Sequence, residues 1–150
     1  MAFSVPQTVL FRHCDPAGIV FYPRYFEMVN DAVEAFFDRA LGLPFGAMHR
    51  THGVPTVSIA SEFRAPSRLG DRLAIGVVPT RVGRTSAALA VAATCGGERR
   101  FETRLTLVHV ELATMRPARW PDGVRRALAA ALDPSTEPAA DGRVPAGDVP

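Results

Sequence analysis

The apolar residues between positions 22 and 41 recur at steps of three and four, which is the period of an α-helix. They are Tyr25, Val29, Ala32, Val33, Phe36, Phe37 and Ala40. Pro23 suits the first turn of a helix, where its missing amide hydrogen costs nothing, so we expect Tyr22 as the N-cap residue. Gly42 is expected to end the helix. The wide aromatic stripe predicts one long helix whose buried face packs against a sheet.

The period changes to two after Val54, as expected for β-strands. Alternating apolar positions fill the ranges 57–63, 73–77, 85–93 and 101–109, with short turns between them. A further strand is expected from Val5 to His13. Because the gaps are short, we expect sequential neighbours to pair antiparallel as a meander. One strand, one long helix and four strands together predict an α+β fold.

The length of 150 residues fits a single domain, which we place at residues 1–132. Its last element is a predicted short helix from Pro121 to Leu132, anchored by Trp120. Residues 133–150 are rich in Pro, Ala and Gly and have little to bury, so we expect a mobile tail there.

The composition excludes several classes of protein. A net charge of +2 and the lack of an aromatic–basic motif argue against nucleic-acid binding. The longest apolar run is too short to span a bilayer. Cys14 and Cys95 make no disulfide framework and suit a reducing compartment. These features predict a cytoplasmic globular protein.

Asp15 is the first candidate for chemistry, because it lies in a Pro-Ala-Gly turn just before the start of the long helix. A helix start offers free N–H groups and partial positive charge that can bind an oxyanion. The alternative is that Asp15 only forms the turn, through its own side-chain hydrogen bond.

The run from Asp15 to Pro23, DPAGIVFYP, together with Tyr25 resembles the active-site segment of 4-hydroxybenzoyl-CoA thioesterases of the hot-dog superfamily. A weaker resemblance continues to about Leu112. The resemblance implies the hot-dog fold, a long antiparallel sheet wrapped around one central helix. It also implies hydrolysis of acyl-CoA thioesters to free acid and coenzyme A, with Asp15 as nucleophile or general base. The Tyr22 amide would then bind the oxyanion, and Gly18 would let the backbone approach the acyl group.

The same resemblance suggests residues that contact the substrate. Tyr25 belongs to the matched run, and Asn30 stands where a 4-hydroxybenzoyl enzyme has an Asp that meets the ring hydroxyl. Arg84, with Arg81 beside it, resembles the basic turn that meets the nucleotide end of coenzyme A, although both could be solvated turn residues. Ser61 could bond water or the acyl carbonyl, or be a buried hydroxyl satisfied by backbone.

Other chemistries remain open. Cys14 beside His13 could act as a nucleophile, but contiguous residues rarely converge on one point. His49 and His52 have the spacing of a metal pair without a third ligand, so we predict no metal and no cofactor.

Alternative functions are a short-chain aliphatic acyl-CoA or acyl-carrier-protein thioesterase, and a non-catalytic acyl-CoA-binding protein. The outer face of the sheet is predicted to be apolar, so we expect it to meet another subunit in a homodimer or homotetramer. The residues that carry this expectation are Ala88, Ala90, Ala92, Val108 and Val110.

Overall fold

The computed structural model describes residues 2–136, and most of the predicted tail, residues 137–150, lies outside the described part. The elements in chain order are β1 (Phe3–Thr8), the 3-10 helix η1 (Phe11–His13), α1 (Tyr22–Arg39), α2 (Phe45–Met48), β2 (His52–Gly53), β3 (Thr56–Phe63), β4 (Arg72–Val82), β5 (Ser86–Cys95), β6 (Glu98–Val108), β7 (Val110–Glu111), β8 (Arg116–Pro117), α3 (Asp122–Ala131) and the 3-10 turn η2 (Pro134–Thr136).

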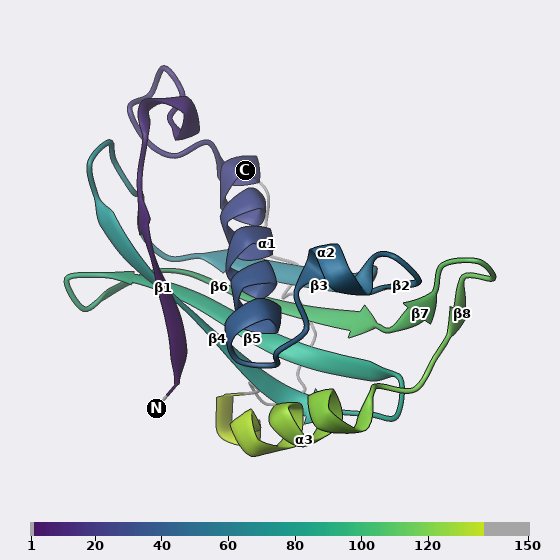
Figure 1. The fold of residues 1–150 in the computed structure, drawn as a ribbon. Helices are drawn as coiled ribbons and strands as arrows, with labels where there is room; N and C mark the ends of the chain where they lie inside the picture. The colour runs from purple at the N-terminus through teal and green to yellow at the C-terminus, as the bar shows by residue number, and fades with distance from the viewer. Residues whose placement is uncertain (1, 137–150) are drawn as a thin grey trace, which may run out of the picture.

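The main sheet has five strands in the order β1-β4-β5-β6-β3, all antiparallel, and α1 lies across one face of it (Figure 1). This is the predicted α+β arrangement of a sheet around one central helix. The predicted meander is correct for β4, β5 and β6 but wrong for β3, which pairs with β6. Both edges of β4 are already occupied, by β1 and β5, so β3 joins the opposite end of the sheet.

The helix α1 buries its predicted apolar stripe, with three differences. Met28 is also buried, whereas Ala40 is exposed because the helix has ended at Arg39. The N-cap residue is Phe21, and Tyr22 is the first helical residue. Pro is tolerated at either of the first two positions, since neither amide has an acceptor within the helix, so Pro23 alone could not place the start. Gly42 closes the helix end with a φ of 66°, as predicted.

The edge strand β3 is far more exposed than its alternating pattern predicted. Val57, Ile59 and Phe63 are 61%, 47% and 47% exposed. The other edge of β3 has no strand partner among residues 2–136, and α1 does not cover it fully.

The outer face of the sheet is less apolar than predicted. Ala90 pairs with Arg104, and Ala92 pairs with Glu102, so charged side chains stand beside the alanines. Val110 is not part of that face, because it belongs to the small sheet β2-β7-β8 and is buried there.

The helix α3 confirms the prediction for the C-terminal part, since Trp120, Val124 and Leu128 are buried in the core. Leu132 is 40% exposed and lies just beyond it. The chain then stays against β4 for a few more residues, because the Asp133 N–H donates to the Pro79 carbonyl at 2.9 Å. This contact covers β4 beyond the point where β1 stops pairing with it.

Candidate active site

Asp15 opens a tight turn that its own sequence explains. The Asp15 carbonyl accepts the Gly18 N–H at 2.9 Å, and its side-chain Oδ1 accepts the Ala17 N–H at 2.8 Å. Pro16 suits the second position of such a turn. Gly18 has a φ of 79°, which favours glycine, and a bond from Asp15 N–H to the Ile19 carbonyl at 3.0 Å completes a turn with a bulge. Gly18 is therefore required by the turn itself, whether or not a substrate approaches it.

The segments on either side of this turn form a short hairpin. Cys14 and Val20 pair as an antiparallel bridge, and the Phe21 N–H donates to the His13 carbonyl at 2.9 Å. The hairpin leads directly into α1. Asp15 and the first residue of the helix are thus parts of one hydrogen-bonded unit.

This hairpin rests on the segment between β3 and β4. The Val20 N–H donates to the Ser67 carbonyl at 2.8 Å. The segment is held in turn by Asp71, whose Oδ2 accepts the Arg68 N–H at 2.9 Å and Arg100 Nη1 at 2.7 Å. These two hydrogen bonds hold the pKa of Asp71 below its usual value. An ion pair between Asp71, just before β4, and Arg100 of β6 therefore supports the loop that carries Asp15.

The hydrogen bonds of His13 and Cys14 give no support to a Cys–His pair. His13 is buried, and its Nδ1 accepts the Leu10 N–H at 2.8 Å. Burial lowers the pKa of His13, so the ring is neutral. The Cys14 thiol lies 3.7 Å from the Leu10 carbonyl, which is its hydrogen-bond acceptor.

The start of α1 provides a free donor. Tyr22 is the first helical residue, so its N–H has no acceptor within the helix, while Pro23 has no N–H at all. A shallow cavity of about 310 Å³ lies at this point, lined by Ile19, Tyr22 and Phe63 among others. Tyr22 is 57% exposed. A carbonyl oxygen can reach this helix end from solvent.

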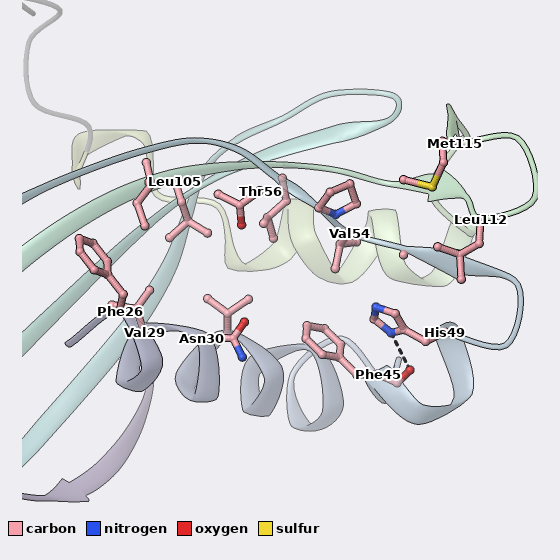
Figure 2. A pocket seen from close by; sticks show the side chains of 15 residues that line it. Phe26, Val29, Asn30, Phe45, His49, Val54, Thr56, Leu105, Leu112 and Met115 are labelled. Atoms are coloured by element: carbon pink, nitrogen blue, oxygen red, sulfur yellow. Dashed lines mark hydrogen bonds between the residues drawn. The ribbon is translucent and has the colours of Figure 1, made fainter. Parts of the chain in front are cut away.

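A larger cavity of about 720 Å³ runs along α1 away from this end. Figure 2 shows Phe26, Asn30, Phe45 and His49 below it and Leu105 among the side chains above it. Phe26 lines this cavity and forms an edge contact with Phe63, which lines the smaller one, with ring centroids 6.4 Å apart. The Phe26 and Phe63 side chains therefore lie between the helix start and the large cavity.

Residues 9–128 match the model of the thioesterase-like superfamily. The chain belongs to this superfamily. A Nostoc punctiforme protein named 1,4-dihydroxy-2-naphthoyl-CoA hydrolase is 26% identical over 84 residues, which are 55% of this chain. The chain spans 57% of that relative's length.

Solved structures of the superfamily share the fold. A gentisyl-coenzyme A thioesterase has a TM-score of 0.78 at 25% identity, over 84% of this chain and 99% of its own. A 1,4-dihydroxy-2-naphthoyl-CoA thioesterase from Synechocystis has a TM-score of 0.79 at 19% identity, over 86% of this chain and 96% of its own. At that identity the Synechocystis structure shows only the common fold.

The structure gathers only some of the predicted substrate-contacting residues of this thioesterase-like chain around the helix start. Tyr25 is buried one turn into α1 and stacks on Phe63, with ring centroids 5.8 Å apart. Ser61 lies on β3, with its hydroxyl 2.7 Å from Thr103 Oγ1 and 3.3 Å from the Glu102 carbonyl, so the protein already satisfies it.

The two predicted arginines lie elsewhere. Arg72, at the start of β4, pairs with Thr8 close to the hairpin, and Arg81 follows nine residues later. At about 3.3 Å per residue, Arg81 is roughly 30 Å away along the strand. Arg84 lies in the turn beyond β4. Within one chain, neither arginine meets the Asp15 hairpin.

Sequence reasoning missed the side chains that shape the large cavity, above all Phe26, His49 and Thr56. The spacing of His49 from His52 indicates at most half of a metal pair and gives no sign that His49 lines a cavity. Within residues 2–136 the structure contains no group of three or more His, Cys, Asp or Glu side chains that could hold a metal ion. No helix in the same range has the length and hydropathy needed to cross a membrane.

Proposed function

We propose that this protein hydrolyses aryl acyl-CoA thioesters to the free acid and coenzyme A. The observation that carries the proposal is the hairpin, which holds the Asp15 carboxylate next to a helix start with a free N–H. The relatives support the choice of substrate, because the two that are 26% and 25% identical are both named for aryl-CoA thioesters.

The proposed chemistry needs few groups. The thioester carbonyl oxygen accepts a hydrogen bond from the Tyr22 N–H, where the partial positive charge of the helix end stabilises the developing oxyanion. Asp15 either deprotonates water as it attacks the carbonyl carbon, or attacks it directly and is then released by water. The carbon–sulfur bond breaks, and the leaving group is a thiolate that needs no dedicated acid, because thiols ionise near pH 8.5.

The cavity defines the acyl group that this mechanism accepts. Its walls are largely apolar, which suits a flat ring, and its volume of about 720 Å³ is larger than a single ring needs. Asn30 stands where a carboxylate meets the ring hydroxyl in 4-hydroxybenzoyl enzymes, and an amide can both donate and accept. We therefore expect 4-hydroxybenzoyl-CoA to be a substrate but not the best one.

We further propose that the active unit is a homodimer or homotetramer. Among residues 2–136, the backbone groups of β3 that point away from β6 have no strand partner, and apolar side chains lie beside this edge, which can pair with a second copy. Arg81 and Arg84 would then serve coenzyme A bound by another subunit. A cytoplasmic location, where the free thiols of Cys14 and Cys95 stay reduced, is part of the same proposal.

The decisive experiment measures free-thiol release from aryl, short aliphatic and long aliphatic acyl-CoAs and from acyl-carrier-protein thioesters. We expect the highest kcat/KM with an aryl group. Faster turnover of an aliphatic thioester would favour the alternative thioesterase, and ligand-induced thermal stabilisation without any turnover would favour a non-catalytic binding protein.

A further inference from the structure

The turn between β7 and β8 holds one residue in an unfavourable backbone conformation. Among residues 2–136, Met115 is the one residue other than glycine with a positive φ, at 56°. In this left-handed region the Cβ of an L-residue crowds the following carbonyl oxygen, which costs free energy, so glycine or asparagine is the usual choice. Methionine has no side-chain donor that could bond the nearby backbone in compensation. The turn therefore does not explain why this position is a methionine.

The backbone of the turn depends on the left-handed conformation. The Met115 N–H donates to the Glu111 carbonyl at 2.7 Å, and the Arg116 N–H donates to Thr114 Oγ1 at 3.3 Å. Glu111 pairs with Arg116 of β8 and with His52 of β2. A different φ at Met115 would separate β8 from β7. The conformation thus belongs to the small sheet, and the side chain needs another reason.

Burial within the chain does not supply that reason. Met115 is 60% exposed, and in the described part of the chain it belongs neither to the hydrophobic core nor to the side chains packed against it. The hydrophobic effect acts on area removed from water, so an exposed methionine contributes little to folding. Met115 therefore adds backbone strain and returns little burial. Its side chain is free to contact something outside this chain.

The position of Met115 offers a contact with the occupant of the large cavity. Met115 and Leu112 line that cavity, at the end opposite Phe26 (Figure 2). The residues of α1 that line it run from Phe26 to Val33, seven steps along the helix or about 10 Å. An acyl group whose carbonyl lies at the helix start must pass Phe26 and follow this part of α1 before it reaches Met115. One ring on the carbonyl is too short for that.

The chemistry of the side chain suits such a contact. Methionine is unbranched, has three rotatable bonds and carries a polarisable sulfur that packs favourably against aromatic rings. Leu112, which is 38% exposed, adds a second apolar surface at the same end of the cavity. A ring that reaches this end would remove both surfaces from water.

We infer that Met115 is a specificity-determining residue, which binds the far end of acyl groups longer than one ring. The contact lies far from the reacting carbon, so it is the same in the bound thioester and in the transition state. It therefore lowers KM for long acyl groups and leaves kcat unchanged. This inference rests on the proposed thioesterase function and deepens it.

The main test is Met115→Gly, which removes the strain and the side chain together. Its thermal midpoint should rise by about 2–4 °C, after the extra freedom of glycine in the unfolded chain is subtracted. KM for 4-phenylbenzoyl-CoA, which has two rings in line, should rise by about five- to ten-fold at constant kcat, because an apolar contact is lost. KM for benzoyl-CoA, which does not reach Met115, should change far less. A purely structural role would not combine higher stability with weaker binding of one substrate.

Two other variants at Met115 sharpen the test. Met115→Asn also suits the left-handed region but brings no apolar surface, so it should raise the ratio of the two KM values as Met115→Gly does. Met115→Leu keeps an apolar side chain and should restore most of the wild-type ratio.

The matched control at another site is Leu69→Gly. Leu69 is 59% exposed and lines neither the large cavity nor the shallow one at the helix start, so the variant should keep the wild-type ratio.

Three results would overturn the inference while thiol release still supports the thioesterase function. The first is an unchanged KM ratio in both Met115→Gly and Met115→Asn. The second is a lower thermal midpoint in both variants, which would show that the side chain stabilises the folded chain itself. The third is dissociation of an oligomer in Met115→Gly, seen by sedimentation, which would assign the exposed side chain to a contact with a second copy.

Binding separates the inference from the proposed function if the wild-type protein releases no thiol. Calorimetry would then use thioether analogues of the two compounds, in which a methylene between carbonyl and sulfur blocks hydrolysis. A higher Kd in Met115→Gly for the two-ring analogue alone would support the inference even though the proposed function had failed. An equal change for both analogues, or no binding of the two-ring analogue to the wild-type protein, would overturn it.

Discussion

The start and the middle of α1 lie in surroundings built from different kinds of contact. At its N-terminal end, the Asp15 hairpin is closed by backbone hydrogen bonds between residues less than nine positions apart. Along its middle, from Phe26 to Val33, the large cavity is enclosed by side chains from α1, α2, β3, β6 and the segment after β7. The hairpin fixes the position of Asp15, and the side chains around the cavity set its shape. In the proposed function, the reacting group and the acyl-binding cavity therefore lie at different places along one helix.

The largest expected effect is on kcat and comes from replacing Asp15 in the hairpin. Asp15→Asn keeps the turn-forming side-chain acceptor but removes the carboxylate, so kcat should fall by about 10²–10⁴-fold while the thermal midpoint stays nearly constant. KM can fall, since a negative charge near the thioester oxygen is lost.

Steady-state kinetics and thermal unfolding of this variant check the prediction together. Asp38→Asn, on the exposed face of α1, is the matched control and should behave as wild type. A kcat within a few-fold of wild type in Asp15→Asn would reduce Asp15 to a turn residue.

The edge strand beside the cavity should control assembly. Val57→Lys places a charge on β3 at a side chain that is 61% exposed, so the single chain should lose little stability while an intersubunit edge contact is broken. Sedimentation should show the dimer or tetramer dissociating to monomers. Leu69→Lys, at a comparably exposed site in the loop before β4, should leave assembly intact. A wild-type protein that is monomeric and active would refute the proposal.

A smaller effect is expected from Asp71, which supports the Asp15 hairpin, and it should appear in the free energy of unfolding. Asp71→Asn removes the charge that Arg100 and the Arg68 N–H stabilise, which should cost about 1–2 kcal/mol of unfolding free energy at pH 7. Because the pKa of Asp71 is lowered on folding, its contribution is present above the unfolded value and is lost as pH falls through the folded one. Urea unfolding should therefore show the deficit of the variant shrinking near pH 3.

Glu98→Gln is the control for this ion pair. Glu98 Oε1 also lies 2.8 Å from Arg100 Nε, but the Glu98 side chain is 62% exposed, so its loss should change stability little. Equal losses in the two variants would mean that Asp71 has no special role beneath the hairpin.

A smaller, pH-dependent effect on the free energy of unfolding is expected at His109. His109 is buried between His52 and Trp120, and burial lowers its pKa. The unfolded chain then takes up the proton first, so stability is complete above about pH 6.5 and falls below it, by at most about 1.4 kcal/mol per pH unit for one proton. His109→Phe keeps a flat ring there and should show a shallower decline from pH 7.5 to 5.5 in urea unfolding. An unchanged slope would assign the decline to His13 instead.

The smallest effects concern the C-terminal segment. Truncation after Thr136 should leave activity and thermal midpoint nearly unchanged, because the composition of residues 137–150 offers little to bury. Truncation after Leu132 also removes the bond from Asp133 N–H to the Pro79 carbonyl and should cost about 1 kcal/mol. Identical midpoints for the two truncations would show that this contact contributes nothing.

The features that the sequence determined by itself are those encoded by neighbouring residues. The 3.6-residue period placed the buried face of α1, and the Asp-Pro-Ala-Gly run specified the turn, because each residue suits one position of it. The α3 helix and the strands β3, β5 and β6 were predictable for the same reason. The strand expected from Val5 to His13 was wrong in its bounds, because β1 ends at Thr8 and residues 11–13 form η1, and β4 runs to Val82, beyond the expected 73–77. The exact N-cap was not, since Pro23 fits two positions equally well.

The tertiary structure alone decided what depends on which edges and faces remain free. The pattern of β3 is the same whether it pairs with β4 or with β6, and only the occupied edges of β4 sent it to the far side of the sheet. The tertiary structure also placed Asn30 and His49 at the wall of one cavity, and it left Arg81 at the end of β4 that is distant from the hairpin. Hydrophobic alternation states which residues share a face, but a side chain's partners are set by elements remote in sequence, whose packing no local pattern encodes.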